Sequence, residues 1–410
     1  MAVETLTFGC RLNTVESEVM RSHAADAVGD LVIVNTCAVT AEAGRQARKA
    51  IRKVARERPD AEIVVTGCGA QVETDLYAAM PEVARLVGND AKTRAETWAD
   101  GPRERIALDD VMALRAAAPT RIAAMARHTR AFVPVQNGCD HRCTFCVIPF
   151  GRGNSRSVPT TAVIDQVRRI VDHGGREVVL TGVDLTAYGR DLADGESLGR
   201  LVQAILSAVP DLDRLRLSSI DSVEADDALL DAIAGEPRLM PHLHLSLQAG
   251  DDLVLKRMKR RHSRADAIRF CETVRRLRPG LVLGADLIAG FPTETEAQCA
   301  RTRDLIAACA LSHVHVFPFS PRPGTPAARM PPVPPPIVRE RAARLREAAA
   351  AALSRHLDGE IGRTHRVLTE RGGLARTEGF TPVRLPSDTP AGLLRDVTVR
   401  GHDGRALLIV

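Results

Sequence analysis

Short apolar runs alternate with amphipathic stretches over the first 115 residues of the chain. Three of these runs, Leu6–Phe8, Leu31–Val34 and Glu62–Thr66, are separated by segments with apolar residues at helical spacing. Short continuous apolar runs indicate buried strands, and helices between successive strands indicate parallel pairing. Residues 1–115 are therefore predicted to form a domain built on an open, parallel α/β sheet.

Six further apolar runs alternate with helical segments in the centre of the chain. Strands that alternate with helices pair in parallel through right-handed crossovers, and six such units predict a partial barrel that opens sideways. The opening would admit a macromolecular substrate to the carboxyl ends of the strands, where barrel enzymes place their chemistry. We expect this barrel within residues 131–357, after a linker over residues 116–130. The six runs are Phe132–Gln136, Glu177–Thr181, Arg214–Ser218, His242–Leu247, Leu281–Leu287 and His313–Phe317.

The pattern changes again in the last hundred residues. Pro318–Pro336 is rich in proline and predicts an extended, semi-rigid strap, and Ile337–Leu357 has the composition of a strong helix. Short β-type segments separated by Gly, Pro and Asp then predict a small antiparallel β-barrel over residues 358–410. These segments are Thr364–Leu368, Thr381–Leu385, Val397–Val399 and Ala406–Val410. The predicted fold class is α/β, in three parts.

Composition narrows the class of protein. The chain has 410 residues, 45% of them hydrophobic, and a net charge of +5, which suits a globular protein of two or three domains and permits an anionic partner. It has no apolar run of about 18 residues and no basic leader, so we expect a cytoplasmic protein without a membrane partner. Nine cysteines in that reducing compartment indicate metal binding rather than a disulfide framework.

Three cysteines lie on one loop directly after the first barrel strand. These loop cysteines are Cys139, Cys143 and Cys146, within Asn137-Gly-Cys-Asp-His-Arg-Cys-Thr-Phe-Cys146. Three thiolates at this spacing suit an iron–sulfur cluster with one iron left open to a ligand. A zinc site with His141 as the fourth ligand is an alternative, although a ligand placed between two others closes such a site awkwardly. The third interpretation is three packed thiols.

Each predicted strand of the first domain is followed at once by a cysteine. These strand-end cysteines are Cys10, Cys37 and Cys68. Ligands of open α/β sheets bind beyond the carboxyl ends of the strands, so the three thiols are in a position to form a second cluster site. Glycines beside Cys10 and Cys68 favour that interpretation because they let the backbone approach an inserted group closely. The alternative is that small thiols simply pack at strand ends.

The segment Ala41–Arg58 predicts a helix with one basic face and one apolar face. A solvated charged surface and a surface for a phosphate backbone explain the basic face equally well. A second basic run, Lys256–Arg261, leaves the same alternatives open. The basic residues of the predicted helix are Arg45, Arg48, Lys49, Arg52, Lys53 and Arg56.

Small or polar residues stand at the ends of several predicted barrel strands. Together they suit a small polar cofactor, although each by itself fits ordinary turn chemistry. His313 and His315 share one face of a strand, where packing or hydrogen bonding is favoured over metal binding. The remaining cysteines, Cys271, Cys299 and Cys309, lack ligand spacing and are expected to be structural.

The loop cysteines, with Phe145 before the last of them, resemble the radical S-adenosylmethionine (SAM) signature. Taken with the strand-end cysteines, the chain resembles the radical SAM methylthiotransferases, and the likeness spans nearly its whole length. That family combines an N-terminal cluster domain, a radical SAM barrel and a C-terminal barrel called TRAM. Further matching motifs are Asn35-Thr-Cys-Ala-Val-Thr40, Gly151-Arg-Gly-Asn-Ser-Arg156, Gly290-Phe-Pro-Thr-Glu294 and Phe317-Pro-Phe-Ser-Pro-Arg-Pro-Gly-Thr325.

The resemblance implies two [4Fe–4S] clusters and SAM as cofactors. The cluster on the loop cysteines would leave one iron free for the amino and carboxylate groups of SAM, whose reductive cleavage gives a radical that removes hydrogen from an unactivated carbon. The cluster on the strand-end cysteines would deliver sulfur that another SAM methylates. By the same resemblance Phe145, Gly182 and Gln248 line the SAM pocket. A reducing electron donor such as flavodoxin or ferredoxin is implied, and the sulfur donor stays open.

The stretch Thr181-Gly-Val-Asp-Leu-Thr-Ala-Tyr-Gly189 resembles the branch of the family that acts on N6-threonylcarbamoyladenosine beside the tRNA anticodon. The expected reaction adds a methylthio group at C2 of that adenine, and a single-stranded anticodon-loop purine enters a pocket at lower cost than a duplex base. Isopentenyladenosine in tRNA and an aspartate of a ribosomal protein are alternative substrates. An RNA-binding iron–sulfur redox sensor or electron carrier is the alternative of a different class, but such a protein needs no barrel with a cofactor face.

Overall fold

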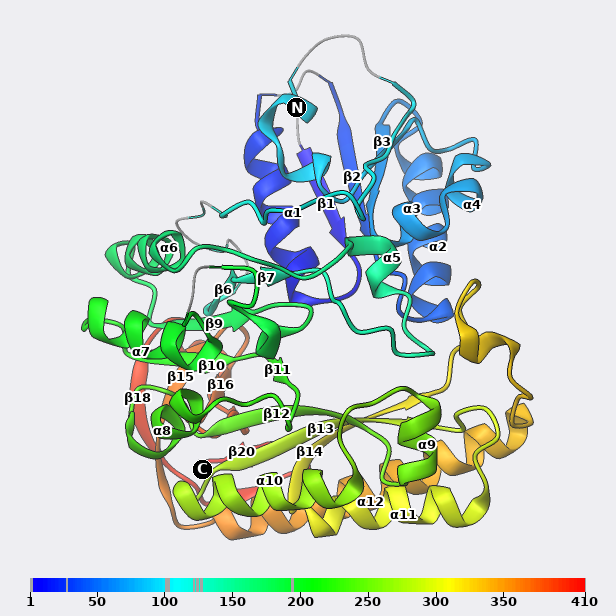
Figure 1. The fold of residues 1–410 in the computed structure, drawn as a ribbon. Helices are drawn as coiled ribbons and strands as arrows, with labels where there is room; N and C mark the ends of the chain where they lie inside the picture. The colour runs from blue at the N-terminus through cyan, green and yellow to red at the C-terminus, as the bar shows by residue number, and fades with distance from the viewer. Residues whose placement is uncertain are drawn as a thin grey trace.

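The computed structural model describes residues 3–26, 29–99, 104–120, 122, 125, 128–192 and 195–409. An N-terminal α/β domain lies above a larger body of strands and helices, and the last strands of the chain pack at one side of that body (Figure 1). The expected linker over residues 116–130 lies partly outside the described residues.

The N-terminal domain contains a five-stranded parallel sheet in the order β1-β2-β3-β4-β5. The three predicted strands are confirmed, and β2 is buried along its whole length because Val32 and Val34 pack on one side of the sheet and Leu31 and Ile33 on the other. The strands β4 and β5 were not predicted, since three and two residues carry too little pattern. The elements are β1 (Val3–Thr7), α1 (Arg11–His23), β2 (Leu31–Thr36), α2 (Ala41–Glu57), β3 (Glu62–Gly67), α3 (Cys68–Val72), α4 (Thr74–Ala78), β4 (Arg85–Val87), the 3-10 turns η1 (Ala91–Thr93) and η2 (Ala95–Thr97), and β5 (Ile106–Ala107).

The six predicted barrel strands are confirmed, and all their pairings are parallel. β10 ends at Leu217 and β11 begins at Ser219, so one extended segment pairs first with β9 and then with β12. That segment joins the sheet β10-β9-β6 to the sheet β11-β12-β13-β14. The strands are β6 (Ala131–Pro134), β9 (Glu177–Thr181), β10 (Arg214–Leu217), β11 (Ser219–Ile220), β12 (His242–Gln248), β13 (Val282–Ala289) and β14 (Leu311–Pro318), and a short antiparallel pair is formed by β7 (Gln136–Asn137) and β8 (Arg156–Ser157).

Helices cover the outside of the barrel strands and bury one continuous apolar core. Val167, Ile205 and Val274, from three different helices, pack against strand residues such as Leu180 and Leu283. α10 and α11 each begin with a capping box, at Ser263 and Thr295, which satisfies free backbone N–H groups at their first turns. The helices are α5 (Ile148–Arg152), α6 (Thr160–Asp172), α7 (Leu198–Ala208), α8 (Asp227–Gly235), α9 (Asp252–Arg257), α10 (Arg264–Leu277), α11 (Glu296–Ala308) and α12 (Pro335–Glu360), with the 3-10 turns η3 (Leu185–Ala187) and η4 (Pro326–Arg329).

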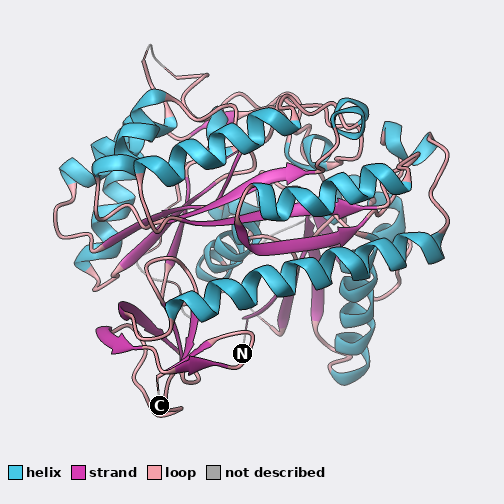
Figure 2. Ribbon diagram, turned by 90° about the horizontal axis from the view of Figure 1, so that it is seen from below, coloured by secondary structure: helices cyan, strands magenta, loops and turns pink. Residues whose placement is uncertain are grey.

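The proline-rich stretch Pro318–Pro336 was predicted to be extended throughout, and this prediction is wrong in part. It contains η4, and the helix α12 already begins at Pro335. Proline is tolerated in the first turn of a helix because its missing N–H would have no partner there. α12 then runs beside β13 and β14 and carries the chain to the C-terminal strands, which gather at one of its ends (Figure 2).

The C-terminal strands form a six-stranded sheet in the order β18-β15-β16-β17-β20-β19. The predicted antiparallel pairing holds for four of its five contacts, but β17 and β20 pair in parallel, which corrects a purely antiparallel arrangement. The strands are β15 (Thr364–Glu370), β16 (Leu374–Arg376), β17 (Pro382–Arg384), β18 (Leu394–Thr398), β19 (Gly401–His402) and β20 (Leu407–Leu408). Within the described part of the chain, no helix has both the length and the apolar character needed to cross a membrane.

Candidate metal centres and cofactor cavity

The strand-end cysteines follow β1, β2 and β3, and the parallel register of these strands brings their carboxyl ends together. Burial raises the pKa of Cys37 to about 11, and the neighbouring thiols of Cys68 and Cys10 add to the rise. Gly9 has φ +106°, and a Cβ at that position would lie 2.8 Å from Cys37 Cβ and 3.0 Å from its Sγ. Only glycine therefore allows the turn that carries Cys10 to pass so close to Cys37.

The loop cysteines lie between β7 and α5. Gly138 opens the loop with φ +73°, and a Cβ there would lie 1.9 Å from the carbonyl oxygen of Asn154. Gln136 Nε2 donates a hydrogen bond to the Gly138 carbonyl at 2.7 Å, which fixes the start of the loop. Burial raises the pKa of Cys146 to about 11 and the pKa of Cys139 well above its usual range. Thiols in this environment stay protonated at neutral pH until a metal displaces the proton.

The two sets of cysteines face each other. Val147, directly after Cys146, packs against Cys68 and Ala38. On the following turn, a Cβ at Gly151 would lie 3.3 Å from Cys68 Cβ, so α5 rests closely on the start of α3. Figure 1 shows α5 beside α3 at the junction between the N-terminal domain and the barrel. Two groups from distant parts of the sequence thus meet at one place.

A buried cluster of ions lies directly beside the strand-end cysteines. Arg152 on α5 donates hydrogen bonds to Glu16 at 2.8 Å and to Asn13 at 2.7 Å, and Lys92 donates to Glu16 at 2.6 Å. Burial alone would raise the pKa of Glu16, but Arg152 and Lys92 outweigh burial and lower it to about 2. This ion cluster joins α1 and η1 of the N-terminal domain to α5 of the barrel.

Charged groups also surround the loop cysteines. Arg260 Nη1 lies 3.6 Å from Cys143 Sγ, and its Nη2 donates to Asp221 at 2.6 Å. A cation beside a thiolate stabilises the ionised form and is suited to a ligating cysteine.

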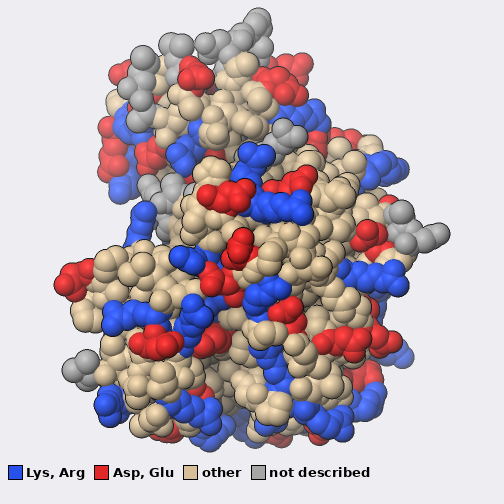
Figure 3. Space-filling view, turned by 90° about the vertical axis from the view of Figure 1, so that its left-hand side faces the viewer, with Lys and Arg blue, Asp and Glu red and all other residues tan. Residues whose placement is uncertain are grey.

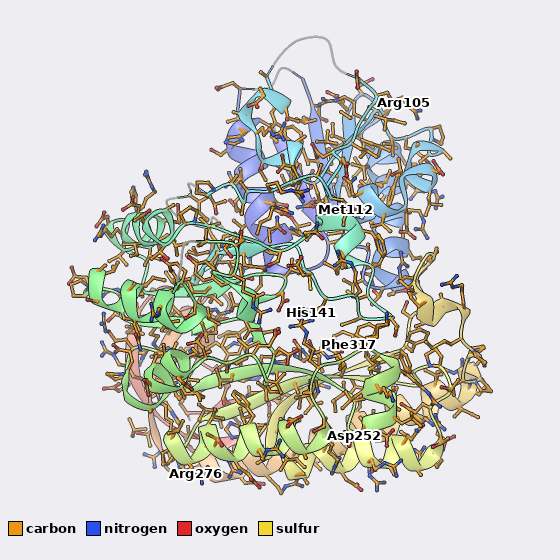
Figure 4. All side chains as sticks on the ribbon, in the orientation of Figure 1. Arg105, Met112, His141, Asp252, Arg276 and Phe317 are labelled. Atoms are coloured by element: carbon orange, nitrogen blue, oxygen red, sulfur yellow. The ribbon has the colours of Figure 1, made fainter. Side chains whose placement is uncertain are left out.

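His141 makes its closest contacts with carboxylates, and its ring nitrogen also lies within 4.8 Å of Cys139 Sγ. Its Nε2 lies 2.9 Å from Asp184 and 3.4 Å from Glu224, and hydrogen bonds from these two groups raise the pKa of His141 to about 9. Figure 4 shows His141 near the middle of the molecule, close to Phe317.

The donor sets fit iron–sulfur clusters better than single zinc ions. Among the described residues, neither set of three cysteines has its sulfur atoms all within 4.8 Å of one another. A tetrahedral zinc ion with Zn–S bonds of about 2.3 Å would require sulfur atoms about 4 Å apart. A larger inorganic group held by thiolates suits sulfur atoms that lie further apart than this.

Two of the three residues expected in the SAM pocket share a cavity. Phe145 and Gln248 line a cavity of about 210 Å³ together with Cys146, so this cavity adjoins the loop cysteines. Gln248 has φ +67° at an irregular position of the β12–β13 pairing, which turns it out of the strand. Gly182 lies elsewhere: it packs against Gln136 and lines a second cavity of about 530 Å³. We call the second one the central cavity.

The basic face of α2 is less uniform than its sequence indicates. Arg48 is half-buried near Tyr77, and three other cations face nearby acids in the pairs Arg45–Glu42, Arg52–Glu82 and Lys53–Glu57. Lys49 and Arg56 are exposed and stand outside these pairs. Figure 3 shows the side of the molecule that faces away from α2, and basic and acidic side chains are interspersed there as well.

Sequence reasoning missed most of the residues around the thiols. Arg152 stands in the quoted motif Gly151–Arg156 and Arg260 in the basic run Lys256–Arg261, but neither pattern shows that the side chain turns inward. Glu16 and Lys92 carry no sequence signal at all, because isolated charged residues on helices and turns are usually exposed.

Comparisons with known proteins are consistent with this architecture. Residues 133–306 match the model of the radical SAM superfamily, and residues 2–88 match that of the uncharacterized protein family UPF0004. A threonylcarbamoyladenosine tRNA methylthiotransferase, MtaB, of Rickettsia prowazekii is 47% identical over 93% of this chain and 91% of its own length. A tRNA-2-methylthio-N(6)-dimethylallyladenosine synthase of Erythrobacter litoralis is 35% identical over 90% of this chain and 86% of its own.

A similar fold occurs among solved structures. The radical S-adenosylmethionine methyltransferase TsrM from Kitasatospora setae, with cobalamin and a [4Fe-4S] cluster bound, has a TM-score of 0.54 and 15% identity. The likeness covers 75% of this chain and 68% of that one, and it concerns the fold.

Proposed function

The chain belongs to the methylthiotransferase family of the radical SAM superfamily, and from this premise we propose that it adds a methylthio group to C2 of N6-threonylcarbamoyladenosine beside the tRNA anticodon. The protein is an enzyme that transfers a sulfur-containing group, and its cofactors are [4Fe–4S] clusters and SAM. The Rickettsia prowazekii relative named for threonylcarbamoyladenosine is 47% identical, against 35% for the Erythrobacter litoralis relative named for dimethylallyladenosine, which supports the choice of substrate.

The observation that carries the proposal is the juxtaposition of both sets of cysteines with two adjoining cavities. The cavity of Phe145 and Gln248 adjoins the loop cysteines, and the central cavity reaches Cys10. Asp286 and Phe317 line both cavities, so the two are neighbours. A redox sensor or electron carrier would need neither of them.

We assign roles to the residues as follows. Cys139, Cys143 and Cys146 would hold the cluster that binds SAM, with Phe145 and Gln248 beside that cofactor and Gly182 facing the substrate. Cys10, Cys37 and Cys68 would hold the second cluster. When bound, these groups supply radical chemistry and a source of sulfur. The chain itself orients them through Gln136 and Arg260 and keeps the junction dry through Val147.

The proposed division of labour follows the three parts of the chain. Residues 1–115 form the second cluster domain, 131–357 the radical SAM barrel behind a linker over 116–130, and 358–410 the TRAM-like part. The partners proposed are tRNA, through its anticodon loop, and a reducing electron donor such as flavodoxin or ferredoxin. We propose that the enzyme works in the cytoplasm.

Mass spectrometry of tRNA nucleosides from cells that lack the gene tests the function directly. We expect the methylthio form of threonylcarbamoyladenosine to disappear and its unthiolated parent to accumulate. Loss of the methylthio isopentenyl nucleoside instead would assign the chain to the other tRNA branch. Restoration by the wild-type gene but not by a Cys143→Ala gene would exclude an indirect effect.

The exposed cations of α2 provide a second test. Replacing Lys49 and Arg56 together by glutamate should weaken tRNA binding about 10-fold at low salt and lower the slope of log affinity against log salt by about two, because each lost phosphate contact contributes about 0.9. Fluorescence anisotropy with labelled tRNA measures both quantities. Arg269→Glu with Arg303→Glu is the matched control, since α10 and α11 lie at the opposite end of the molecule from α2 (Figure 1). Unchanged binding by the first pair would exclude α2 from the tRNA surface.

A further inference from the structure

The central cavity lies where all three parts of the chain meet. Its wall includes Cys10 and Arg11 from the N-terminal domain, Asp286 and His313 from the barrel, and Arg376 and Phe380 from the C-terminal strands. Its volume of about 530 Å³ is in the range of sites that enclose a small ligand. A group that enters it therefore contacts residues from every part of the chain.

The wall offers unused polar atoms. Ser218 is 6% exposed, and its Oγ has no hydrogen-bond partner among the described residues. The Nε2 atom of His313 is likewise buried without a partner in the described part of the chain. Buried polar atoms in proteins are rarely left unpaired, so two of them on one cavity wall indicate a polar ligand.

The charges at the cavity are predominantly positive. Arg11 and Arg376 are its two permanent cations, and Asp286 is its one carboxylate among the lining residues. Asp286 is already engaged, since His244 Nε2 lies 2.9 Å and His315 Nδ1 3.2 Å from its Oδ1. Burial alone would raise the pKa of Asp286, but these two hydrogen bonds outweigh burial and lower it. Its carboxylate is therefore engaged by the two histidines rather than by Arg11 or Arg376.

Arg11 forms no ion pair with a carboxylate among the described residues. Its guanidinium lies 5.8 Å from the centre of the Phe132 ring, and no ion pair joins it to any described residue. A half-buried guanidinium that no carboxylate contacts among the described residues is a setting in which an anionic ligand gains charge-assisted hydrogen bonds.

Arg376 belongs to an arginine cluster around Phe380. Arg130, Arg216 and Arg376 lie 5.0, 5.0 and 4.7 Å from the centre of that ring. Their carboxylate partners are shared: Glu177 faces Arg130 and Arg216, and Glu370 faces Arg130 and Arg376. The Arg376 Nε atom is 3.6 Å from Glu370, too far for a strong hydrogen bond. Arg376 Nη1 donates to the Phe380 carbonyl at 3.2 Å, and the guanidinium keeps further N–H donors for an anion.

We infer that Arg11 and Arg376 bind the carboxylate of the threonylcarbamoyl group and so select this nucleoside over adenosines with an uncharged N6 substituent. The inference rests on the proposed function. N6 and C2 lie on the same edge of adenine, so a base that turns C2 toward Cys10 brings its N6 substituent into the same cavity. The exposed ring of Phe317 at the cavity edge offers a face on which the base stacks.

Binding of matched RNAs tests the selection without requiring turnover. Three anticodon stem-loops would carry threonylcarbamoyladenosine, its neutral carboxamide analogue or isopentenyladenosine. With the full chain and its clusters reconstituted without oxygen, fluorescence anisotropy should show the carboxylate RNA binding on the order of 10- to 100-fold more tightly than the carboxamide RNA, as expected for hydrogen bonds to a charged group. Arg376→Gln and Arg11→Gln should each reduce that ratio at least several-fold.

Controls separate charge recognition from damage to the fold. Arg303→Gln, at an exposed position of α11, should keep the wild-type ratio. Iron content and the thermal unfolding midpoint should match the wild type in every variant, and Arg11→Gln serves as an independent test if Arg376→Gln disturbs the contact with Phe380.

The outcomes also distinguish the inference from the function on which it rests. Equal affinity of the wild type for the carboxylate and carboxamide RNAs, or ratios unchanged in both variants, would overturn carboxylate recognition and leave the proposed function standing. Preference of the wild type for the isopentenyl RNA would overturn both.

Discussion

Cys143→Ala should reduce the cleavage of SAM by strong reductant to the background rate, while the N-terminal cluster remains in place. Cys143 is buried between Cys139 and Cys146 and lies 3.6 Å from Arg260, so its loss removes one of three thiolates and leaves that cation without its sulfur partner. Two thiolates on this loop cannot hold the cluster that leaves one iron open. Anaerobic purification, liquid chromatography of the cleavage products and iron analysis would measure the effect, and the iron content should fall by half.

A substitution in the strand-end cysteines separates the roles of the two sets of thiols. Cys37→Ala should halve the iron content as well, but it should leave reductive cleavage of SAM intact and abolish methylthiolation of tRNA. Cys299→Ala is the control, because Cys299 is buried on α11 away from both sets. If Cys143→Ala kept full cleavage activity, the assignment of the loop cysteines to SAM chemistry would be wrong.

Glu16→Gln should destabilise the N-terminal domain by about 3–5 kcal/mol, the usual cost of leaving a buried ion without its partner. Lys92 is fully buried and Arg152 is 2% exposed, and Glu16 accepts hydrogen bonds from both. Removing its charge leaves two buried cations without their counter-ion. Trp98 is the only tryptophan of the chain, is buried in this domain and donates to the Lys92 carbonyl at 2.9 Å, so its fluorescence during denaturation reports the change.

The effect of Glu16 should depend on pH in a defined direction. The pKa of Glu16 is about 2 in the folded protein against an ordinary 4.5. Its contribution to the free energy of unfolding is therefore fully present above pH 4.5 and is lost as the pH falls through about 2. The difference between Glu16→Gln and the wild type should therefore shrink over that window. Glu57→Gln is the matched control, because its pair with Lys53 is exposed and should contribute less than about 0.5 kcal/mol. Equal destabilisation by both variants would show that the buried ion cluster stabilises the domain no more than an exposed ion pair does.

The arrangement of secondary structure follows closely from the sequence. The strands of the first domain and of the barrel were predictable because buried parallel strands are continuous apolar runs, as in Leu31–Thr36 and Glu177–Thr181. The short strands β5 and β16 were not predicted, because two or three residues show too little of a periodic pattern. The proline-rich stretch was misjudged at its end, where prolines begin α12 instead of continuing an extended strap.

The candidate site was only partly visible in the sequence. Spacing and strand ends pointed to the six cysteines, because both are local properties of the chain. Contacts between segments far apart in the sequence could not be predicted from local patterns. Nothing near Cys68 in sequence indicates that Arg152, Glu16 and Lys92 will form a buried ion cluster beside it, and nothing near Arg11 indicates that Arg376 will face the same cavity.

The sequence by itself therefore determined which elements form, where the thiols stand on them and which family the chain resembles. It did so because periodicity, turns and motifs act over a few neighbouring residues. The tertiary structure alone decided that the two sets of cysteines face each other, that Arg260 turns inward to Cys143, and that three parts of the chain enclose a cationic cavity. Burial and the balance of charges depend on residues far apart in the sequence, and only the folded chain brings those together.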